Sequence, residues 1–586
     1  MEINIRITGE AGQGIAAAAA VLGKTVTRCG YFAHSYNDAE SRVRGGLNFN
    51  HLRVSTQPRR GTTGKVDILV ALSEQGAKVF GAKLSEEGVL LQAKPWEALD
   101  SRPSTVGDDL EKRAKEAGSK KVLGTVGVAT VCGLMGVDPQ VLKTALQERF
   151  TSKKKVIQAN LDGVDAGYEL ARSLKRDDLR LAPPAGEEGK DPSKASRLWM
   201  GGAQVVAGGA LAGGLGFMAA YPMSPSTGVI INLGRWAKET GVVVVQAEDE
   251  VGAINMVAGA SYAGARSMVA TSGGGFALME EGVSLLGMIE CPAVIVVAQR
   301  PGPATGLPTR QAQGDLHMVL RAGHGHFPRV VVARRDFQEG LTVSARASDS
   351  PGRIGGPVFV LTDQHFQDSQ STLEALPSQG LPKERHLLDR ETLEQLQVYR
   401  RYENTESGVS PMAAPGISKH VVVVDSDEHD QEGHLTESAE EAQLMIEKRL
   451  RKERHLARAM DEDDYLPVTT GEVSGNPLVI SWGSTHPTVS EAVEAFREGA
   501  GPGGETERAV AHTHLSWLWP APRRELERLL EAASKVVVVE NNVDGQLVQY
   551  LRQVTGVEVD EWIGRLDGRP LLVEELVGEL EDEFSS

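Results

Sequence analysis

The sequence predicts an α/β protein built from several doubly wound domains. Strand-like apolar runs alternate with helix-like runs along most of the 586 residues. Several of the strand-like runs are apolar throughout, which is typical of parallel sheets buried on both faces. Gly-rich or Pro-rich turns follow several of these runs, where doubly wound domains bind their ligands. A chain of this length is expected to form about three to five domains.

The first predicted domain covers residues 1–178. Its expected strands lie at 3–8, 66–73 and 88–93, and its first expected helix lies at 16–29. Residues 179–198 are polar and rich in Pro, Gly and charge, so we expect an exposed linker there.

The second predicted domain covers residues 199–375, where the alternation of strands and helices resumes. Its expected strands lie at 242–248, 267–272, 293–299, 329–333 and 357–362. The stretch 201–220 is rich in Gly and Ala. We interpret it as a tightly packed helix followed by a strand, because its hydrophobicity is weak for a membrane span.

Residues 376–465 form a charged connecting segment in this prediction. The stretch 436–460 is dense in Glu, Lys and Arg, and we expect a solvated helix with ion pairs three and four residues apart. Residues 466–586 form a third α/β domain, with strands expected at 477–484, 509–518 and 535–541.

The composition excludes several classes of protein. The chain has 62 Lys and Arg against 79 Asp and Glu, a net charge of −17, which argues against a general nucleic-acid binder. Three cysteines are too few for a disulfide framework, or for an iron–sulfur or structural zinc site built by this chain alone. The N-terminus shows no export signal, so we expect a cytoplasmic protein without a membrane span.

A Gly-rich loop, GEAGQG at 9–14, separates the first strand from the first helix. Gly9, Gly12 and Gly14 let the backbone approach a phosphate at the helix N-terminus, and a purely structural turn is the alternative. Arg42 and Arg44, in SRVRGG, suit phosphate as well. Surface ion pairs or a subunit contact explain these two arginines equally well.

Four further motifs each follow a strand of the second domain: YPMSPST at 221–227, QAEDE at 246–250, TSGGG at 271–275 and AQRPGPATGLPTRQAQGD at 298–315. Ligands bind outside the carboxyl ends of strands in parallel sheets, so we expect these motifs to meet. A carboxylate at 248–250 suits either a helix cap or a catalytic group.

Taken together, these motifs resemble the 2-oxoacid:ferredoxin oxidoreductases. YPMSPST, Glu250 with the small-residue helix behind it, TSGGG and QRPGPATGLPT are similar to the alpha subunit. GEAGQG and SRVRGG are similar to the gamma component, here fused ahead of alpha. The resemblance covers nearly the whole chain apart from the linker. It implies a gamma-like domain, a pyrimidine-binding domain of the thiamine diphosphate fold and a transketolase C-terminal-like domain, in that order.

The resemblance also implies an activity. Such enzymes decarboxylate a 2-oxoacid on thiamine diphosphate, pass electrons through iron–sulfur clusters to ferredoxin and form an acyl-CoA. It assigns Glu250 to the ring nitrogen N1′ of the thiamine aminopyrimidine, with Glu248 as the nearest rival. It assigns Arg300 to the 2-oxoacid carboxylate, and the hydroxyls of Ser224 and Thr309 to orienting the substrate.

CoA is implied as co-substrate, held or gated by the gamma-like domain. The candidate contacts are Gly9, Gly12, Gly14, Arg42 and Arg44.

The sequence departs from the family pattern at three positions. Ser224 stands where the family usually has Thr, Ala304 where it has Ser, and Gly274 where it has Pro. The loss of a hydroxyl at Ala304 puts the fine substrate specificity in doubt.

Parts of the implied enzyme are missing from this chain. No GDG precedes Asn541-Asn542, and no CxxCxxC occurs. The resemblance therefore implies a beta subunit that brings Mg²⁺, the diphosphate half of the site and a [4Fe-4S] cluster, in an (alpha-beta)2 heterotetramer. We expect no metal site on this chain, and we interpret His429 as a loop-packing residue.

The substrate implied is 2-oxoglutarate, because the best-studied fused members act on it. Arg310 and Arg42 are candidates for its distal carboxylate. Pyruvate or a branched-chain 2-oxoacid is the first alternative, and a catalytically silent scaffold is the second. An NAD-linked oxidoreductase is disfavoured because the glycine order at 9–14 differs from the dinucleotide fingerprint.

Overall fold

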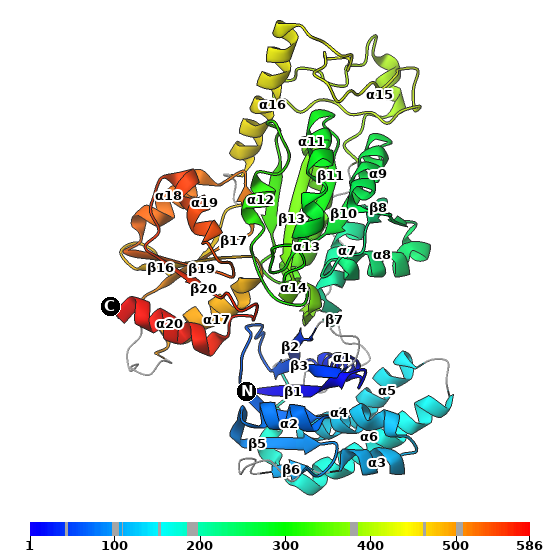
Figure 1. Ribbon diagram of the computed structural model, residues 1–586, viewed down its shortest axis with the longest axis vertical. Coiled ribbons are helices and arrows are strands. Elements are labelled where there is room, and N and C mark those ends of the chain that lie inside the picture. Colours follow the sequence, from blue (N-terminus) through cyan, green and yellow to red (C-terminus); the bar gives the residue numbers. More distant parts are fainter. Residues whose placement is uncertain are drawn as a thin grey trace. The chain divides into compact units, whose positions relative to one another are not determined.

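The computed structural model describes residues 1–40, 45–96, 105–107, 109–150, 154–184, 197–374, 385–460, 465–499 and 508–585 (Figure 1). The chain divides into two compact units. One comprises Met1–Gly201 with Asp368–Leu376, and the other comprises Gly202–Gln367 with Pro377–Ser586. The predicted α/β class of doubly wound domains is confirmed in both units.

The first unit contains an eight-stranded mixed sheet. Its strands, in spatial order, are β6 (Thr105–Gly107), β5 (Leu84–Gln92), β4 (Val66–Ala71), β1 (Glu2–Ala11), β3 (Gly45–Ser55), β2 (Phe32–Asp38), β14 (Gln370–Glu374) and β7 (Arg197–Gly201). The β6-β5-β4-β1 half is parallel, and the remaining pairings are antiparallel. The linker predicted at 179–198 therefore runs into β7, and β14 returns to the same sheet from the end of the range 199–375.

The helices of the first unit are α1 (Ile15–Arg28), α2 (Glu74–Gly81), α3 (Leu110–Glu116), α4 (Leu123–Leu134), α5 (Pro139–Arg149) and α6 (Lys154–Leu174). Short 3-10 turns occupy Lys120–Val122 and Asp177–Leu179. Helix α1 packs against α4 and α5, and α4 packs along α6. Close packing is possible because small residues line these helices. At Gly167 of α6, for example, an added Cβ would lie 2.6 Å from the Val126 carbonyl oxygen.

The second unit contains a seven-stranded sheet, in the order β18 (Trp517–Trp519), β12 (Val330–Ala333), β13 (Pro357–Asp363), β11 (Ala293–Gln299), β10 (Ser267–Thr271), β8 (Phe217–Ala220) and β9 (Val243–Gln246). All pairings are parallel except the one between β18 and β12. Strands β10, β11 and β13 are buried along their whole length, as the apolar runs predict for a sheet covered on both faces.

Helices cover both faces of this sheet: α7 (Gly202–Ala212), α8 (Thr227–Thr240), α9 (Glu250–Tyr262), α10 (Gly273–Ala277), α11 (Glu280–Met288), α12 (Leu316–Leu320), α13 (Phe337–Ile354) and α14 (Gln364–Asp368). Helix α7 packs on α13, and α9 packs on α11. The stretch 201–220 is thus a helix and a strand, as predicted. No helix within the described ranges combines the length and apolarity that a bilayer crossing requires.

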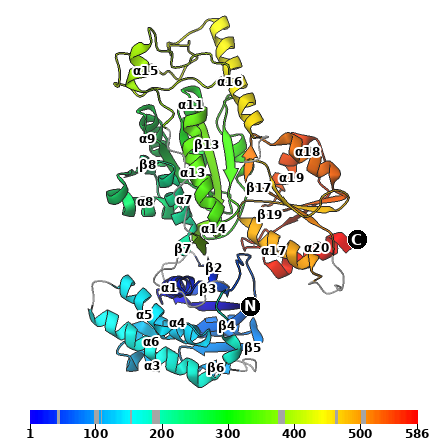
Figure 2. The same ribbon diagram turned by 180° about the vertical axis from the view of Figure 1, so that it is seen from behind.

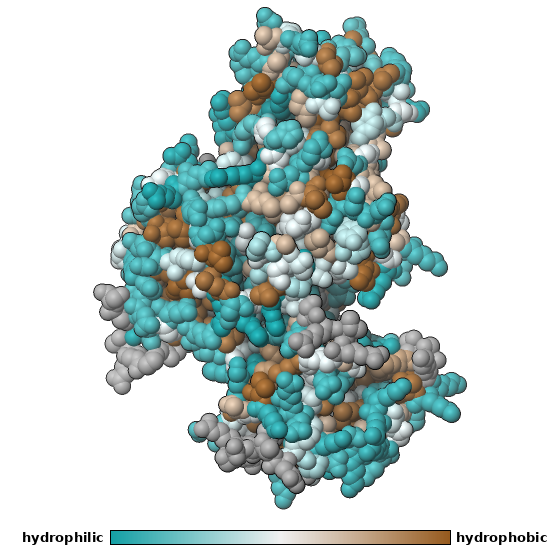
Figure 3. All heavy atoms as spheres, viewed as in Figure 1, coloured by the Kyte–Doolittle hydropathy of each residue, from teal (hydrophilic) through white to brown (hydrophobic). Residues whose placement is uncertain are grey.

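The last part of the second unit forms a five-stranded sheet, in the order β15 (Val468–Thr470), β17 (Ala511–Leu515), β16 (Pro477–Trp482), β19 (Lys535–Glu540) and β20 (Glu561–Gly564). Its helices are α17 (His486–Arg497), α18 (Arg523–Ala532), α19 (Gln546–Thr555) and α20 (Val573–Ser585), with a 3-10 turn at Gly483–Thr485. One hydrophobic core runs from the seven-stranded sheet into this one, from Ile295 and Phe359 to Ile480 and Val538. Hydrophilic residues cover most of the face seen in Figure 3, with hydrophobic patches between them.

The connecting segment contains α15 (Arg390–Gln395) and α16 (Ala439–Ala459), which lie together near α11 in both views (Figures 1 and 2). The prediction of a solvated α16 with local ion pairs is wrong for one face of the helix, which is buried. Lys448 and Lys452 are 0% and 1% exposed, and both bind the buried carboxylate of Glu290, between α11 and β11. Their i, i+4 spacing places both ammonium groups on one face of the helix. Both therefore bind the Glu290 carboxylate, which is distant in sequence, and not acidic residues of α16 itself.

Candidate active site

The four predicted motifs meet at one edge of the seven-stranded sheet. Residues 221–226 follow β8, 247–250 follow β9, 272–275 follow β10, and 300–315 follow β11. Strand β8 lies between β9 and β10, so the chain passes from β8 to β9 in one direction and then from β9 back past β8 to β10 in the other. Such a change of winding direction leaves a crevice at the carboxyl ends of the strands, which is the usual ligand site of this architecture.

The structure separates the three carboxylates of QAEDE. Glu248 and Asp249 are exposed, whereas Glu250 is 4% exposed. Asp249 is the N-cap of α9, and its Oδ1 accepts a hydrogen bond from the Gly252 N–H at 2.6 Å. Because Asp249 caps the helix, Glu250 is not needed for that purpose.

The Glu250 carboxyl lies against the TSGGG turn. A Cβ added at Gly275 would come within 2.6 Å of Glu250 Oε1 and 2.3 Å of Thr271 Oγ1, so only glycine leaves room for this carboxyl. Glu250 Oε1 is buried and has no hydrogen-bond partner among the described residues. Since buried carboxylate oxygens are nearly always hydrogen-bonded, this atom calls for a donor from outside the described residues.

Asp315 supplies a second carboxyl beside the same turn; the residue is half-buried, and its Oδ2 atom is buried. Its two oxygens would lie 2.5 and 2.6 Å from a Cβ at Gly273, and Oδ2 has no partner among the described residues. Burial raises the pKa of Asp315 to about 6, and the positive charge of Arg300 opposes the shift. The motif at 298–315 includes Asp315, but the sequence analysis assigned no role to this residue.

Arg300 is anchored to the segment after β8. Its Nη1 donates a hydrogen bond to the carbonyl oxygen of Ser224 at 2.9 Å, which joins two residues 76 positions apart. The structure thus brings Ser224 and Arg300 together through the serine backbone, while the Ser224 side chain stays exposed. Among the described residues, no hydrogen bond joins the Thr309 hydroxyl to either of them.

The loop that carries Arg300 and Thr309 is held by the C-terminal part of the same unit. Gln313 is fully buried; its backbone N–H donates to the Asn541 carbonyl at 2.6 Å, and its Oε1 accepts from the Asn541 N–H at 3.0 Å. Gln313 Nε2 donates to the Trp482 carbonyl at 2.9 Å. The Gln311 N–H donates to the Gly568 carbonyl at 3.0 Å. Sequence reasoning missed this support, because it joins segments more than 160 residues apart.

The GEAGQG loop belongs to the first unit. Gly12 and Gly14 have φ values of 93° and 80°, which favour glycine, and Gly14 is the N-cap of α1. At Gly9 a Cβ would lie 2.3 Å from Gln13 Oε1, the oxygen that accepts from the Glu10 N–H. Arg42 and Arg44 lie outside the described residues.

No group of His, Cys, Asp and Glu among the described residues is arranged to hold a metal ion. His429 is fully buried, its ring stacks on Tyr402 at 3.6 Å between centroids, and its nitrogens face the carbonyls of Asp430 and Met288. It packs a loop, as predicted.

Three family models match the chain. Residues 208–448 match the thiamine diphosphate-binding domain of pyruvate flavodoxin/ferredoxin oxidoreductases. Residues 4–170 match the pyruvate ferredoxin/flavodoxin oxidoreductase model, and 476–576 match core domain II of pyruvate:ferredoxin oxidoreductase. The candidate active site therefore lies within the part of the chain that matches a thiamine diphosphate-binding domain.

Relatives and a solved structure match nearly the whole chain. The alpha subunit of 2-oxoacid:ferredoxin oxidoreductase 2 from Aeropyrum pernix is 30% identical over 99% of this chain and 97% of its own length. The 2-oxoglutarate synthase subunit KorA of Methanothermobacter thermautotrophicus is 29% identical over 64% of this chain and 96% of its own. A structure of 2-oxoglutarate:ferredoxin oxidoreductase from Magnetococcus marinus, with 2-oxoglutarate, coenzyme A and succinyl-CoA bound, is 28% identical, covers 99% of both chains and has a TM-score of 0.88. The chain therefore belongs to the 2-oxoacid:ferredoxin oxidoreductases, as an alpha subunit of these enzymes.

Proposed function

We propose that this chain is the fused gamma–alpha subunit of a 2-oxoglutarate:ferredoxin oxidoreductase. It oxidatively decarboxylates 2-oxoglutarate with CoA to an acyl-CoA and CO2, or runs the reverse reaction, with ferredoxin as electron carrier. The observation that carries the proposal is the buried Glu250 carboxyl, whose Oε1 has no hydrogen-bond partner among the described residues, in the same crevice as Arg300. The choice of 2-oxoglutarate is supported by the ligands in the Magnetococcus marinus structure and by the name of the Methanothermobacter relative.

The residues around Glu250 fit the aminopyrimidine of thiamine diphosphate. Glu250 would share a proton with the ring nitrogen N1′, and the room left by Gly275 keeps its carboxyl in place. A hydrogen bond to this nitrogen would satisfy Oε1, which no described residue pairs, and burial would keep water from competing for this bond. Thiamine diphosphate, when bound, supplies the nucleophilic carbon and the electron sink for decarboxylation.

Arg300 would bind the 2-oxoacid carboxylate. The Ser224 carbonyl accepts a hydrogen bond from Arg300 Nη1 and so fixes the plane of the guanidinium group. The other guanidinium N–H groups would then donate two hydrogen bonds to the substrate carboxylate. The hydroxyls of Ser224 and Thr309 would orient the substrate. For the distal carboxylate of 2-oxoglutarate, Arg310 and Arg42 remain candidates.

The remaining components would come from other chains. With only three cysteines, two of them fully buried, this chain does not supply the ligands of an iron–sulfur cluster. We propose a beta subunit that carries a [4Fe-4S] cluster and, with Mg²⁺, the diphosphate half of the thiamine site, in an (alpha-beta)2 heterotetramer that reduces ferredoxin.

CoA would bind to the gamma-like domain at the Gly9–Gly14 loop, and Arg42 and Arg44 would be further contacts. The exposed turn and the uncapped start of α1 support a phosphate there.

The test is to purify the chain with its cluster-bearing partner and to follow reduction of a low-potential acceptor in the presence of thiamine diphosphate, Mg²⁺, CoA and a 2-oxoacid. Glu250→Gln should lower kcat at least about 100-fold, since acid–base assistance typically contributes that much, while circular dichroism stays unchanged. Asp249→Asn, at the exposed neighbour, is the matched control and should retain most of the activity. Near-normal turnover of Glu250→Gln would refute the assignment. Faster turnover with pyruvate than with 2-oxoglutarate would refute the substrate, and inactivity of the wild-type complex toward all 2-oxoacids would favour a scaffold.

A further inference from the structure

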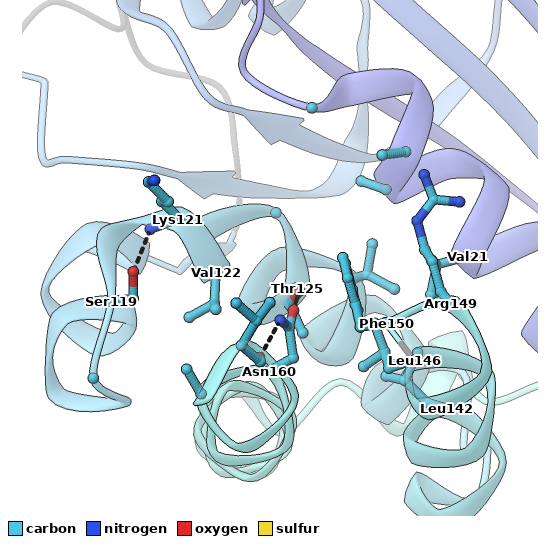
Figure 4. Close-up of a pocket in the computed structure, with 18 of the residues that line it drawn as sticks. Val21, Ser119, Lys121, Val122, Thr125, Leu142, Leu146, Arg149, Phe150 and Asn160 are labelled. Carbon is cyan, nitrogen blue, oxygen red and sulfur yellow. Dashed lines mark hydrogen bonds between the residues drawn. The ribbon is translucent and has the colours of Figure 1, made fainter. Parts of the chain in front are cut away.

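The proposed function gives no role to one carboxyl of the candidate active site, that of Asp315. It does account for the cavity of about 580 Å³ between α1, α4, α5 and α6 in the first unit (Figure 4). Gln13 and Gly14, which belong to the loop proposed for CoA, line that cavity. In the second unit, by contrast, the Asp315 Oδ2 atom is buried and has no hydrogen-bond partner among the described residues.

Helix capping does not explain the Asp315 carboxyl. Asp315 is the N-cap residue of α12, yet its side chain accepts no hydrogen bond from the helix backbone. Aspartates at two other helix starts do cap their helices. Asp249 accepts from the Gly252 N–H at 2.6 Å, and Asp389, before α15, accepts from the Thr392 N–H at 2.8 Å. An N-cap aspartate usually makes this bond, so its absence leaves the Asp315 carboxyl available for another contact.

Two glycines of the TSGGG turn make room for two carboxyls. A Cβ at Gly273 would lie 2.5 and 2.6 Å from the two carboxyl oxygens of Asp315, and one at Gly275 would lie 2.6 Å from Glu250 Oε1. Neither glycine has a positive φ, so the backbone conformation of the turn does not require glycine at these positions. Space for the carboxyls does require it, and Asp315 and Glu250 therefore lie against the same turn.

The backbone of Asp315 is fixed at the end of β11. Its N–H donates to Gln299 Oε1 at 3.0 Å, and Gln299 Nε2 donates to the Thr362 carbonyl at 3.2 Å. Gln299 is 1% exposed and directly precedes Arg300. The two ends of the loop 300–315 therefore meet at one point, which places Arg300 and Asp315 at the same end of the strand.

Charged and titratable groups stand on three elements near Asp315: Arg300 at the end of β11, Glu250 at the start of α9 and His317 in α12. His317 Nε2 forms a hydrogen bond with the Gln546 carbonyl at 3.1 Å. Within the described ranges, no ion pair joins Arg300 to Asp315. Burial raises the pKa of Asp315 to about 6, against the positive charge of Arg300. The carboxyl is therefore protonated in a pH range where an ordinary aspartate is ionised.

We infer that Asp315, as the neutral acid, donates a hydrogen bond to the 2-oxo oxygen of the substrate whose carboxylate Arg300 binds. A 2-oxoacid carries these two acceptors on adjacent carbons, so one molecule satisfies both side chains at the end of β11. A protonated carboxyl has one O–H to donate, whereas a carboxylate has none and would repel the substrate carboxylate. The inference deepens the proposed function and rests on it for the class of substrate.

The test is steady-state kinetics of the purified complex from pH 5.5 to 8, with the 2-oxoacid varied. Asp315→Ala should raise KM for the 2-oxoacid about tenfold at pH 6, because it removes a buried hydrogen bond. KM for CoA should stay unchanged.

Asp315→Asn separates hydrogen bonding from a structural role. Its amide donates at every pH, so KM for the 2-oxoacid should stay near the wild-type value at pH 6 and remain flat. The wild-type KM should rise as Asp315 ionises and should exceed that of Asp315→Asn at pH 8. Gly273→Ala should act like Asp315→Ala, because the new Cβ would displace the carboxyl.

Asp389→Asn is the matched control. It changes the N-cap aspartate of another short helix, which does cap, and should leave KM and its pH dependence unchanged. Circular dichroism checks the folding of every variant. The inference is overturned if Asp315→Ala and Asp315→Asn both keep the wild-type KM and pH profile, or if Asp315→Asn raises KM as much as Asp315→Ala does at every pH. In both cases the active wild type leaves the proposed function standing. A wild-type complex that turns over no 2-oxoacid overturns the function and the inference together.

Discussion

The buried cluster at Glu290 offers a sharp test of how the connecting segment is held. The Glu290 carboxylate, 2% exposed, accepts a hydrogen bond from Lys448 Nζ at 2.7 Å and binds Lys452 with its other oxygen. Arg401 donates to the Glu290 backbone carbonyl at 2.7 Å. Burial opposes ionisation of Glu290, but the charges of Lys452, Lys448 and Arg401 outweigh it and hold its pKa well below the usual range.

Glu290→Gln keeps the shape of the side chain and removes its charge. Two ammonium groups, 0% and 1% exposed, then lack a counter-charge. Removing one partner of a buried ion pair costs about 3–5 kcal/mol. If this core unfolds as one transition, the midpoint of thermal unfolding should fall by roughly 6–20 °C, at about 2–4 °C per kcal/mol for 150–250 residues.

The assay is thermal unfolding followed by circular dichroism, alongside kcat/KM of the folded complex. Turnover should change little, because Glu290 lies before β11, at the opposite end of that strand from Arg300. Glu527→Gln is the matched control: it removes an exposed ion pair with Arg523, which contributes less than about 1 kcal/mol. Replacing Lys448 and Lys452 by Met in the Glu290→Gln background should recover stability. A midpoint shift no larger than that of Glu527→Gln would refute the reasoning.

Three further predictions concern the site and its support. Gly275→Ala should lower kcat at least tenfold, because its Cβ would lie 2.6 Å from Glu250 Oε1 and push the carboxyl away. Gln313→Ala should raise KM for the 2-oxoacid several-fold, because it removes one of the two hydrogen bonds that join the Arg300 loop to Asn541 and leaves the Asn541 N–H and the Trp482 carbonyl unpaired. Burial raises the pKa of Glu540 to about 7, so the folded chain binds a proton there more tightly than the unfolded chain. Its contribution to stability is complete below the unfolded pKa near 4.5 and should be lost, by up to about 3 kcal/mol, as pH rises to about 7.

Each of these predictions has its own check. Gly234→Ala, in α8 with open space around the added Cβ, should keep full activity; a Gly275→Ala enzyme as active as this control would contradict the first. Gln313→Ala should change KM more than kcat, and an unchanged KM would contradict the second. Urea unfolding midpoints measured from pH 4 to 8 test the third, and Glu540→Gln should flatten the profile. A wild-type profile as flat as that of the variant would contradict it.

The sequence by itself was sufficient for the apolar strands, for several helices such as α1, α9 and α16, and for the family. Apolar runs such as 293–299 mark strands wherever they lie, since a fully buried parallel strand needs an apolar side chain on both faces. The four motifs after β8, β9, β10 and β11 were predicted to meet for the same reason: parallel strands end at one edge. Local spacing also identified the turn at 9–14, where positive φ values require glycine.

Contacts between distant segments were decided only by the tertiary structure. The choice of Asp249 rather than Glu250 as the cap of α9 depends on where the TSGGG turn makes room for a carboxyl. The pairing of Lys448 and Lys452 with Glu290, across more than 150 residues, reversed the expectation of a solvated helix. The hydrogen bond between Asn541 and Gln313 joins residues 228 positions apart in the sequence. Sequence periodicity reports only neighbours within one element, whereas burial of a charge or an amide is settled by whichever partner the folded chain brings to it.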